Sequence, residues 1–176
     1  EIVTSVESTY DGNDLAQDIE VVVLDADGNE LVEGTDFEVT YYNAEGKEVG
    51  QVVNAGTYTL KVTSDFYKLS GTTEMTVTVN KLDMSTVKAA AVVDKEWDNV
   101  GNVTSYLPWQ ADGVTLDELK LQYKDGDSWV NFPMKQVKAT IVDAAGNEVK
   151  KIVDEGVYTI HFEARNDDAV NNFVVP

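Results

Sequence analysis

An internal repeat constrains this chain more than any other feature of its sequence. Residues 41–65 read YYNAEGKEVGQVVNAGTYTLKVTSD, and residues 141–165 read IVDAAGNEVKKIVDEGVYTIHFEAR. The two segments align at an offset of 100 residues without a gap, and Tyr58 is matched by Tyr158. A repeat of this kind indicates two copies of one folding module.

Both copies carry the pattern of half-buried strands. Apolar and polar residues alternate over residues 37–41, 58–62 and 75–79 of the first copy and over 137–141 and 158–162 of the second. A period of two places each apolar set on one face of a sheet. Turn sequences rich in Asp, Asn and Gly separate these runs, at residues 25–29, 43–47, 124–127 and 143–147. Short strands at this spacing predict an all-β chain of sandwich type, with residues 115–121 as a single helical turn.

The repeat divides the chain into a first domain at residues 1–81 and a second at residues 82–176. The apolar residues at 19, 21 and 23 correspond to those at 119, 121 and 123, so the repeat extends upstream of the two aligned segments. The second copy is longer, and its extra residues form an insertion around 98–115. The first domain has 16 acidic residues against 4 lysines, a net charge of −12, and the second has a net charge of −7.

The composition excludes several function classes. The chain has no Cys, one His and a formal net charge of −19. Disulfides, thiolate zinc sites and cysteine nucleophiles are therefore excluded, and a nucleic-acid partner is disfavoured because phosphates would be repelled. No apolar run approaches the roughly 20 residues of a membrane span. The single histidine, His161, alternates against Ile160 and Phe162, so we expect it to point outward and not to act in catalysis.

Two heptapeptides carry a resemblance to a known family. Residues 54–60 (NAGTYTL) and 154–160 (DEGVYTI) are similar to the immunoglobulin strand entry, in which a Tyr two residues before a Cys closes a tyrosine corner. Leu60 and Ile160 stand at the Cys position. Together with YDG at residues 10–12 and EGTDF at 33–37, these segments resemble the bacterial immunoglobulin-like tandem repeats of secreted cell-surface and adhesin proteins. The motif residues are Gly56, Tyr58, Gly156 and Tyr158.

The resemblance implies two tandem immunoglobulin-like β-sandwich domains without catalytic activity or cofactor. Such repeats act as stalks, spacers or adhesion modules of larger proteins on the bacterial surface. The expected partners are neighbouring immunoglobulin-like domains and a glycan or protein of the host or cell wall. The chain begins at Glu1, which is expected of a segment of a longer secreted protein.

An alternative function is a carbohydrate- or protein-binding module with its site on the insertion. All three Trp lie in the second copy, at positions 97, 109 and 129. Tyr106, Trp109 and Gln110 lie in the insertion, and Trp129 follows an Asp-Gly-Asp-Ser turn. Aromatic faces stack on sugar rings while amides bind hydroxyls. Packing is the competing interpretation for Trp97 and Trp109, and Trp129 fits either.

Calcium is the one metal that the acidic sequence leaves open. Asp25, Asp27 and Asn29 superficially resemble the oxygen ligands of an EF-hand loop. However, Gly28 occupies the fourth position of this segment rather than the sixth, and a hairpin turn explains the same residues without a metal. Calcium between the two domains is also left open by the sequence.

A lysine–asparagine isopeptide bond is a further alternative, because such bonds staple cysteine-free bacterial surface domains. Lys88, on the first strand of the second copy, and Asn171 or Asn172, near its end, have the required order. The alternation of Lys88 with Val87 and Ala89 predicts a solvent-facing side chain, whereas the reaction needs a buried lysine.

Overall fold

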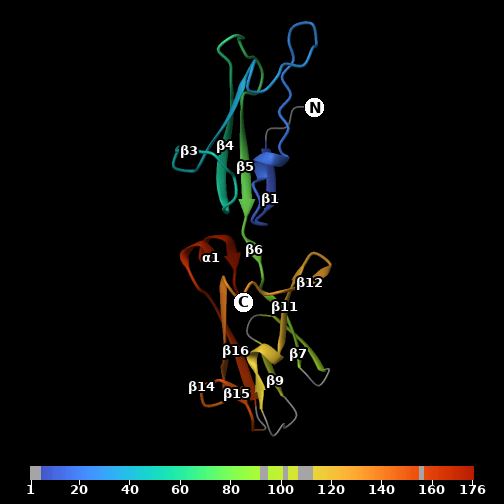
Figure 1. The fold of residues 1–176 in the computed structure, drawn as a ribbon, viewed down its shortest axis with the longest axis vertical. Helices are drawn as coiled ribbons and strands as arrows, with labels where there is room; N and C mark the ends of the chain where they lie inside the picture. The colour runs from blue at the N-terminus through green and yellow to red at the C-terminus, as the bar shows by residue number, and fades with distance from the viewer. Residues whose placement is uncertain (1–4, 92–94, 101–102, 107–112, 155–156) are drawn as a thin grey trace. The chain divides into compact units, whose positions relative to one another are not determined.

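The chain is all-β and divides into two compact units. The computed structural model describes all residues except 1–4, 92–94, 101–102, 107–112 and 155–156. Unit 1 is Glu1–Leu82 and unit 2 is Asp83–Pro176, where the repeat predicts a boundary after residue 81. Strands account for most of the regular structure in each unit (Figure 1). In the described residues no helix is long and apolar enough to cross a bilayer.

Unit 1 is built on one five-stranded sheet in the order β1-β5-β4-β2-β3. β1 runs parallel to β5, and the other neighbours are antiparallel. The predicted alternation is confirmed, because Leu60 and Val77 are buried while Lys61 and Thr78 are partly exposed. The strands are β1 (Ser5–Thr9), β2 (Glu38–Tyr42), β3 (Glu48–Val49), β4 (Gly56–Thr63) and β5 (Glu74–Asn80).

The core of unit 1 lies on one face of this sheet. Its buried cluster comprises Val52, Tyr58, Leu60, Val77 and Val79. The short 3-10 helix η1 (Leu15–Asp18) and the extended segment after it cover the cluster with the side chains of residues 15, 16, 19 and 21. Burial of these side chains removes apolar surface from water and holds the segment on the sheet.

Asp14 fixes the start of this covering segment. Its Oδ1 accepts hydrogen bonds from the backbone N–H of Ala16, at 3.0 Å, and of Val52, at 2.8 Å. The bond from Val52 is the main reason why the pKa of Asp14 is lowered from 3.8, since it stabilises the carboxylate. One side chain thus caps η1 and joins segments 38 residues apart.

Residues 19–23 differ in structure from their repeat counterparts in unit 2. The equivalent residues of unit 2 form β11 (Lys120–Asp125), which pairs with a neighbour on each side. In unit 1 the described residues form only an isolated antiparallel bridge there, between Leu24 and Glu30. Residues 19–23 are extended without a ladder, so the described part of unit 1 holds one continuous sheet.

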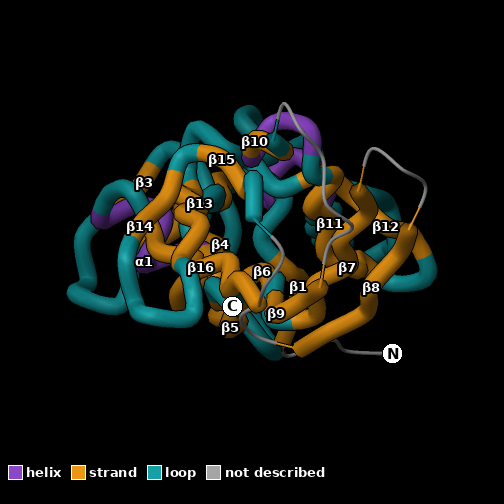
Figure 2. Tube along the Cα trace, turned by 90° about the horizontal axis from the view of Figure 1, so that it is seen from below, coloured by secondary structure: helices purple, strands orange, loops and turns teal. Residues whose placement is uncertain are grey.

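Unit 2 contains two four-stranded sheets; in Figure 2, β7, β8, β11 and β12 lie on the right and β13, β14 and β16 on the left. One has the order β12-β11-β7-β8 and the other β14-β13-β16-β9. The first consists of β7 (Thr86–Ala91), β8 (Lys95–Val100), β11 and β12 (Ser128–Asn131); the second of β9 (Val103–Tyr106), β13 (Val137–Val142), β14 (Glu148–Val149) and β16 (Val157–Ala164).

Aromatic packing links the two sheets of unit 2. Phe132, which follows β12, is 5% exposed. Its ring centroid lies 5.3 Å from that of Tyr123 on β11 and 4.8 Å from that of Phe162 on β16. Val87, Leu121, Val137, Ile141 and Ile160 are buried as well.

Short elements complete unit 2. The predicted helical turn is confirmed as the 3-10 helix η2 (Leu116–Glu118). The α-helix α1 (Asp167–Asn172) begins after Asn166, whose Oδ1 accepts from the N–H of Ala169 at 2.8 Å. The remaining strands are β6 (Leu82–Asp83), β10 (Val114–Thr115), β15 (Lys151–Ile152) and β17 (Phe173–Val174).

The repeated turns have the same geometry in both units. Asn43 Oδ1 accepts from the N–H of residues 45 and 47, and Asp143 Oδ1 accepts from the N–H of residues 145 and 147. The fourth residue of each turn has a positive φ, 79° at Gly46 and 85° at Gly146. Glycine adopts this conformation without the steric cost that a Cβ adds. The predicted turns are confirmed.

Candidate functional site

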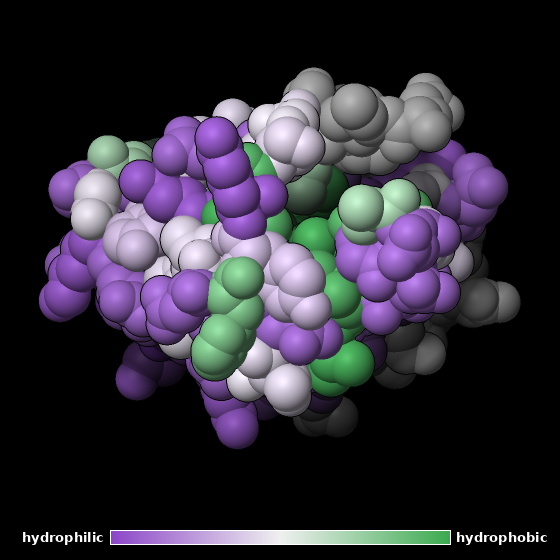
Figure 3. Space-filling model, turned by 90° about the horizontal axis from the view of Figure 1, so that it is seen from above, coloured by the Kyte–Doolittle hydropathy of each residue, from purple (hydrophilic) through white to green (hydrophobic). Residues whose placement is uncertain are grey.

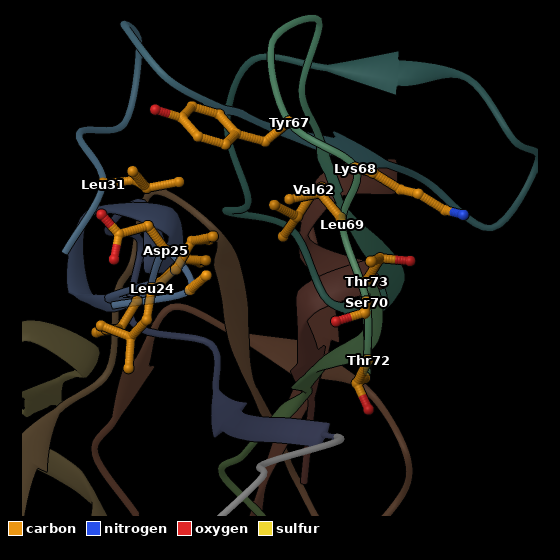
Figure 4. A pocket seen from close by; sticks show the side chains of 14 residues that line it. Leu24, Asp25, Leu31, Val62, Tyr67, Lys68, Leu69, Ser70, Thr72 and Thr73 are labelled. Atoms are coloured by element: carbon orange, nitrogen blue, oxygen red, sulfur yellow. The ribbon is translucent and has the colours of Figure 1, made fainter. Parts of the chain in front are cut away.

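The strongest candidate for a functional site is an open groove of about 510 Å³ in unit 1, which we call the unit 1 groove. One wall is the segment of residues 21–26 with Leu31, and the other is Val62 with the connection between β4 and β5. Figure 4 shows Leu24, Asp25 and Leu31 on one side and Val62 and Leu69 on the other. The lining residues are Val21, Val22, Val23, Leu24, Asp25, Ala26, Leu31, Val62, Tyr67, Lys68, Leu69, Ser70, Thr72 and Thr73.

The first wall is a hairpin-like segment that carries apolar side chains on both faces. Leu31 donates its N–H to the carbonyl oxygen of Val23, and Asp25 donates its N–H to that of Asn29, both at 2.8 Å. Val21 packs on the core, whereas Val22 is 56% exposed and Leu24 is 55% exposed. An uninterrupted apolar run places apolar side chains on both faces of an extended segment, and only one face packs on the core.

The second wall is anchored by Ser64. Its Oγ accepts from the N–H of Phe66 at 3.2 Å and of Tyr67 at 3.1 Å, and donates to the carbonyl oxygen of Asp36 at 2.6 Å. Phe66 is 76% exposed and Tyr67 44% exposed. The ring of Tyr67 extends from this wall toward the side of Leu31 (Figure 4). The loop is therefore held in a defined conformation that presents two aromatic side chains to solvent.

Both walls offer backbone polar groups. No hydrogen bond joins the backbone of Val22, Ser70 or Thr72 to another described residue, whereas the Thr73 carbonyl accepts from Val62 at 2.8 Å. Extended backbone without a ladder can pair with an additional strand. Figure 3 shows apolar side chains gathered along a hollow on one face. The groove thus combines apolar side chains with backbone donors and acceptors.

The unit 1 groove lies in a strongly acidic unit, but its own lining is balanced, with Asp25 as the one carboxylate. Lys68 is the one cation among the lining residues, and unit 1 has 16 acidic residues against 4 lysines. The carboxylate of Asp25 accepts from the N–H of Asp27 and of Asn29, each at 2.9 Å, and from Asn29 Nδ2 at 3.3 Å. The N–H of Asn29 is the main cause of the lowered pKa of Asp25. The carboxylate stays ionised while it closes its own turn.

The residues considered for calcium, Asp25, Asp27 and Asn29, lie in this turn. Asp25 directs its oxygens at the turn's own N–H groups. In the described residues no group of three or more His, Cys, Asp or Glu side chains gathers as a metal site would require. The turn itself accounts for the spacing of these polar residues.

The residues considered for sugar binding are not gathered by the described strands. Trp109 and Gln110 lie outside the described residues. Tyr106 ends β9, opposite Val157, whereas Trp129 is half-buried in β12, opposite Lys124, on the other sheet. Trp97 lies in β8 opposite Ala89. Trp129 is the one indole ring among these residues whose burial is described.

A tyrosine corner is present in both units. The Tyr58 hydroxyl donates to the carbonyl oxygen of Asn54 at 2.8 Å, and the Tyr158 hydroxyl donates to that of Asp154 at 2.9 Å. Gly56 begins β4, and Gly156 lies outside the described residues. The corner fixes the chain at the entry to the long central strand of each unit.

The remaining polar residues that the sequence singles out are His161 and the isopeptide candidates Lys88 and Asn172. His161 is exposed on β16 opposite Thr140, as the alternation predicts. Lys88 lies in β7 between the register partners Gln122 and Asp98, and its side chain is outside the described part. Asn172 is 2% exposed at the end of α1. The isopeptide hypothesis stays a prediction.

Sequence reasoning missed the residues that form the unit 1 groove. Two signals in the sequence point to them: the run VVVL at residues 21–24, which has no polar alternation, and the adjacent aromatics Phe66 and Tyr67 within a polar loop. At such positions a half-buried strand or a surface turn normally carries polar side chains. Either pattern therefore indicates apolar side chains that face solvent.

No protein-family model, curated protein or solved structure matches the chain. A function must therefore be inferred from the geometry of the two units and of the groove.

Proposed function

We propose that the chain is a non-catalytic pair of tandem immunoglobulin-like sandwich modules that serves as a spacer or adhesion segment of a larger bacterial surface protein. The observation that carries the proposal is the duplicated tyrosine corner. The same hydroxyl-to-carbonyl bond occurs at Tyr58 and Tyr158, 100 residues apart, and each corner follows a turn of the same geometry. Repetition of one module is the usual way to build length rather than a catalytic centre.

The use of polar side chains supports this proposal. Asp14, Asp25, Asn43 and Asp143 all direct side-chain oxygens at backbone N–H groups of turns or caps. These groups stabilise local structure, and their partners are already within the chain. Charged residues on exposed strand positions keep such a module soluble.

Mechanical unfolding of the intact chain, pulled from its two ends, tests the spacer role. Two separate events are expected, because each unit has its own compact set of contacts. With about 3.4 Å per extended residue, the events release chain lengths of about 280 and 320 Å, less the folded end-to-end distances. A single event that releases the whole chain at once would contradict independent modules.

Ligand binding is a second candidate function, and one observation favours it. The lining of the unit 1 groove includes Val22, Leu24 and Tyr67, each more than 40% exposed. In a strongly acidic protein such a lining marks a surface that another molecule covers. We therefore propose the unit 1 groove as a second candidate binding surface, while the site on the insertion of unit 2 stays a prediction.

A further inference from the structure

We propose that the unit 1 groove binds an extended, cationic peptide segment of a partner protein, which adds a strand between its two walls. The bound segment would carry apolar side chains at alternate positions and Lys or Arg between them. The inference goes beyond a spacer role, and it stands or falls independently of how the units unfold under force.

The shape of the groove favours a strand. The first wall has residues 21–24 without a ladder, whereas in the second wall Gly71, with a φ of 85°, bends the chain between Ser70 and Thr72. In the described part the backbones of Val22, Ser70 and Thr72 make no hydrogen bond to one another or to other residues. An added strand gains affinity from main-chain hydrogen bonds and specificity from pockets for alternate side chains. Leu24, Leu31 and Leu69 supply the apolar surface for one such set of side chains.

The chemistry of the lining favours a peptide over a sugar. Most of its apolar residues are aliphatic Val and Leu, and Tyr67 is the one aromatic residue among the lining residues. The only lining carboxylate, Asp25, is engaged by its own turn. The hydroxyls of Ser70, Thr72 and Thr73 can serve either ligand, so the preference rests on the aliphatic lining and on the main-chain groups that a peptide backbone needs.

Charge favours a cationic segment over a second copy of the chain. Unit 1 has a net charge of −12, and two copies would bring like charges together. A Lys- or Arg-bearing segment is attracted to the same surface, which raises its rate of association. Asp25 lines the groove beside the cation Lys68, and Asp27 follows in the same turn as Asp25.

The test uses the full chain and a capped ten-residue peptide of alternating Lys and Val as probe. A block peptide of five Lys and five Val has the same charge and composition, and a third peptide carries N-methyl groups on alternate residues. At about 0.15 M salt, where charges are screened beyond about 8 Å, the alternating peptide is expected to bind about tenfold more tightly than either control.

Two further measurements locate the binding. Hydrogen exchange of the amides of residues 21–24 and 69–72 is expected to slow when the alternating peptide is added. Leu24→Gln is expected to weaken binding about tenfold, because it removes an apolar contact of the groove. Val170→Gln is the matched control, since Val170 is 57% exposed in unit 2 and Leu24 is 55% exposed.

Several outcomes would overturn the proposal. Equal binding of the alternating and block peptides indicates attraction by charge alone. Protection of the same amides by cellohexaose but not by the peptide indicates a sugar site. Protection that rises with protein concentration alone, together with dimerisation in sedimentation, indicates a second copy. Absence of protection with every probe removes the groove as a binding site.

Discussion

At the scale of single residues, the two tyrosine corners make the same hydrogen bond in different surroundings. Tyr58 is 8% exposed, whereas Tyr158 is only partly buried. Tyr58→Phe is expected to lower the free energy of unfolding of unit 1 by about 1 kcal/mol, because it removes a hydrogen bond that is partly shielded from water. Tyr158→Phe is expected to cost less than about 1 kcal/mol, since water can replace the donor at a more exposed carbonyl.

Chemical denaturation with two probes separates these effects. All three Trp lie in unit 2, so Trp fluorescence reports unit 2, while far-ultraviolet circular dichroism reports both units. Tyr58→Phe should shift the part of the dichroism transition that fluorescence does not follow, and leave the fluorescence midpoint unchanged. Equal costs of the two substitutions would contradict the role of burial.

Asp14 gives unit 1 a predicted dependence on pH. Its pKa in the folded chain is lowered from 3.8, mainly by the N–H of Val52, so folding favours the ionised form. The stabilisation is complete above the unfolded pKa and is lost as the pH falls through the folded pKa, that is, from about pH 5 downward. Asp14→Ala should cost about 1 kcal/mol at pH 7, the usual size for a lost helix cap.

The matched variant for this prediction is Asp14→Asn, which keeps an oxygen acceptor but cannot ionise. Thermal melts between pH 3 and pH 7 should show that the difference between the native chain and Asp14→Asn shrinks as the pH falls. A difference that stays constant across this range would show that the charge of Asp14 does not contribute.

At the scale of strands and turns, the local patterns predict the structure well where a pairing partner follows nearby in sequence. The alternation at 137–141 and 158–162 predicts β13 and β16, and the turn at 143–147 predicts the hairpin that joins β13 to β14, as observed. The apolar residues at 19, 21 and 23 match those at 119, 121 and 123, yet a strand forms only in unit 2. A strand needs a ladder as well as a pattern, and that partner is not encoded in the segment itself.

The need for partners distant in sequence also explains why the local sequence does not predict the unit 1 groove. The position of Phe66 and Tyr67 depends on the bond from Ser64 Oγ to the carbonyl of Asp36, 28 residues earlier. Contacts of this kind arise from tertiary packing, so the sequence reveals the aromatic pair but not the wall that it forms. The tyrosine corners, by contrast, span four residues and are readable from local sequence.

Phe132 is the predicted link between the two sheets of unit 2. Phe132→Ala should lower the free energy of unfolding of unit 2 by about 3 kcal/mol, because it removes a buried ring that contacts Tyr123 and Phe162 and leaves a cavity. Trp fluorescence in denaturant measures the loss. Met134→Ala, at a side chain that is 41% exposed, is the control and should cost less than about 0.5 kcal/mol. Equal losses of unfolding free energy for Phe132→Ala and Met134→Ala would contradict the role of Phe132 in the core of unit 2.

At the scale of the whole molecule, the net charge of −19 governs the response to salt. The ion pairs Lys61–Glu74 and Lys138–Glu163 join exposed side chains, and such pairs contribute little. Self-repulsion therefore dominates, and screening should stabilise the fold. A gain of about 1 kcal/mol corresponds to a rise of about 4–8 °C in Tm for a unit of this size. Unit 1, with the larger net charge, should gain more than unit 2.

Calcium must be distinguished from this screening effect. Melts in CaCl2 and in MgCl2 at equal concentration apply the same ionic strength, so the two Tm values should agree within about 1 °C if the acidic residues respond only to screening. A resident calcium ion would instead raise Tm with calcium concentration by mass action. Asp27→Asn supplies the control, because it removes one oxygen charge from the turn at residues 25–29 and leaves the Asp25 hydrogen bonds in place. A calcium-specific rise that Asp27→Asn abolishes would show that this turn is a metal site, and that the hydrogen bonds of Asp25 to its own backbone give way to a cation.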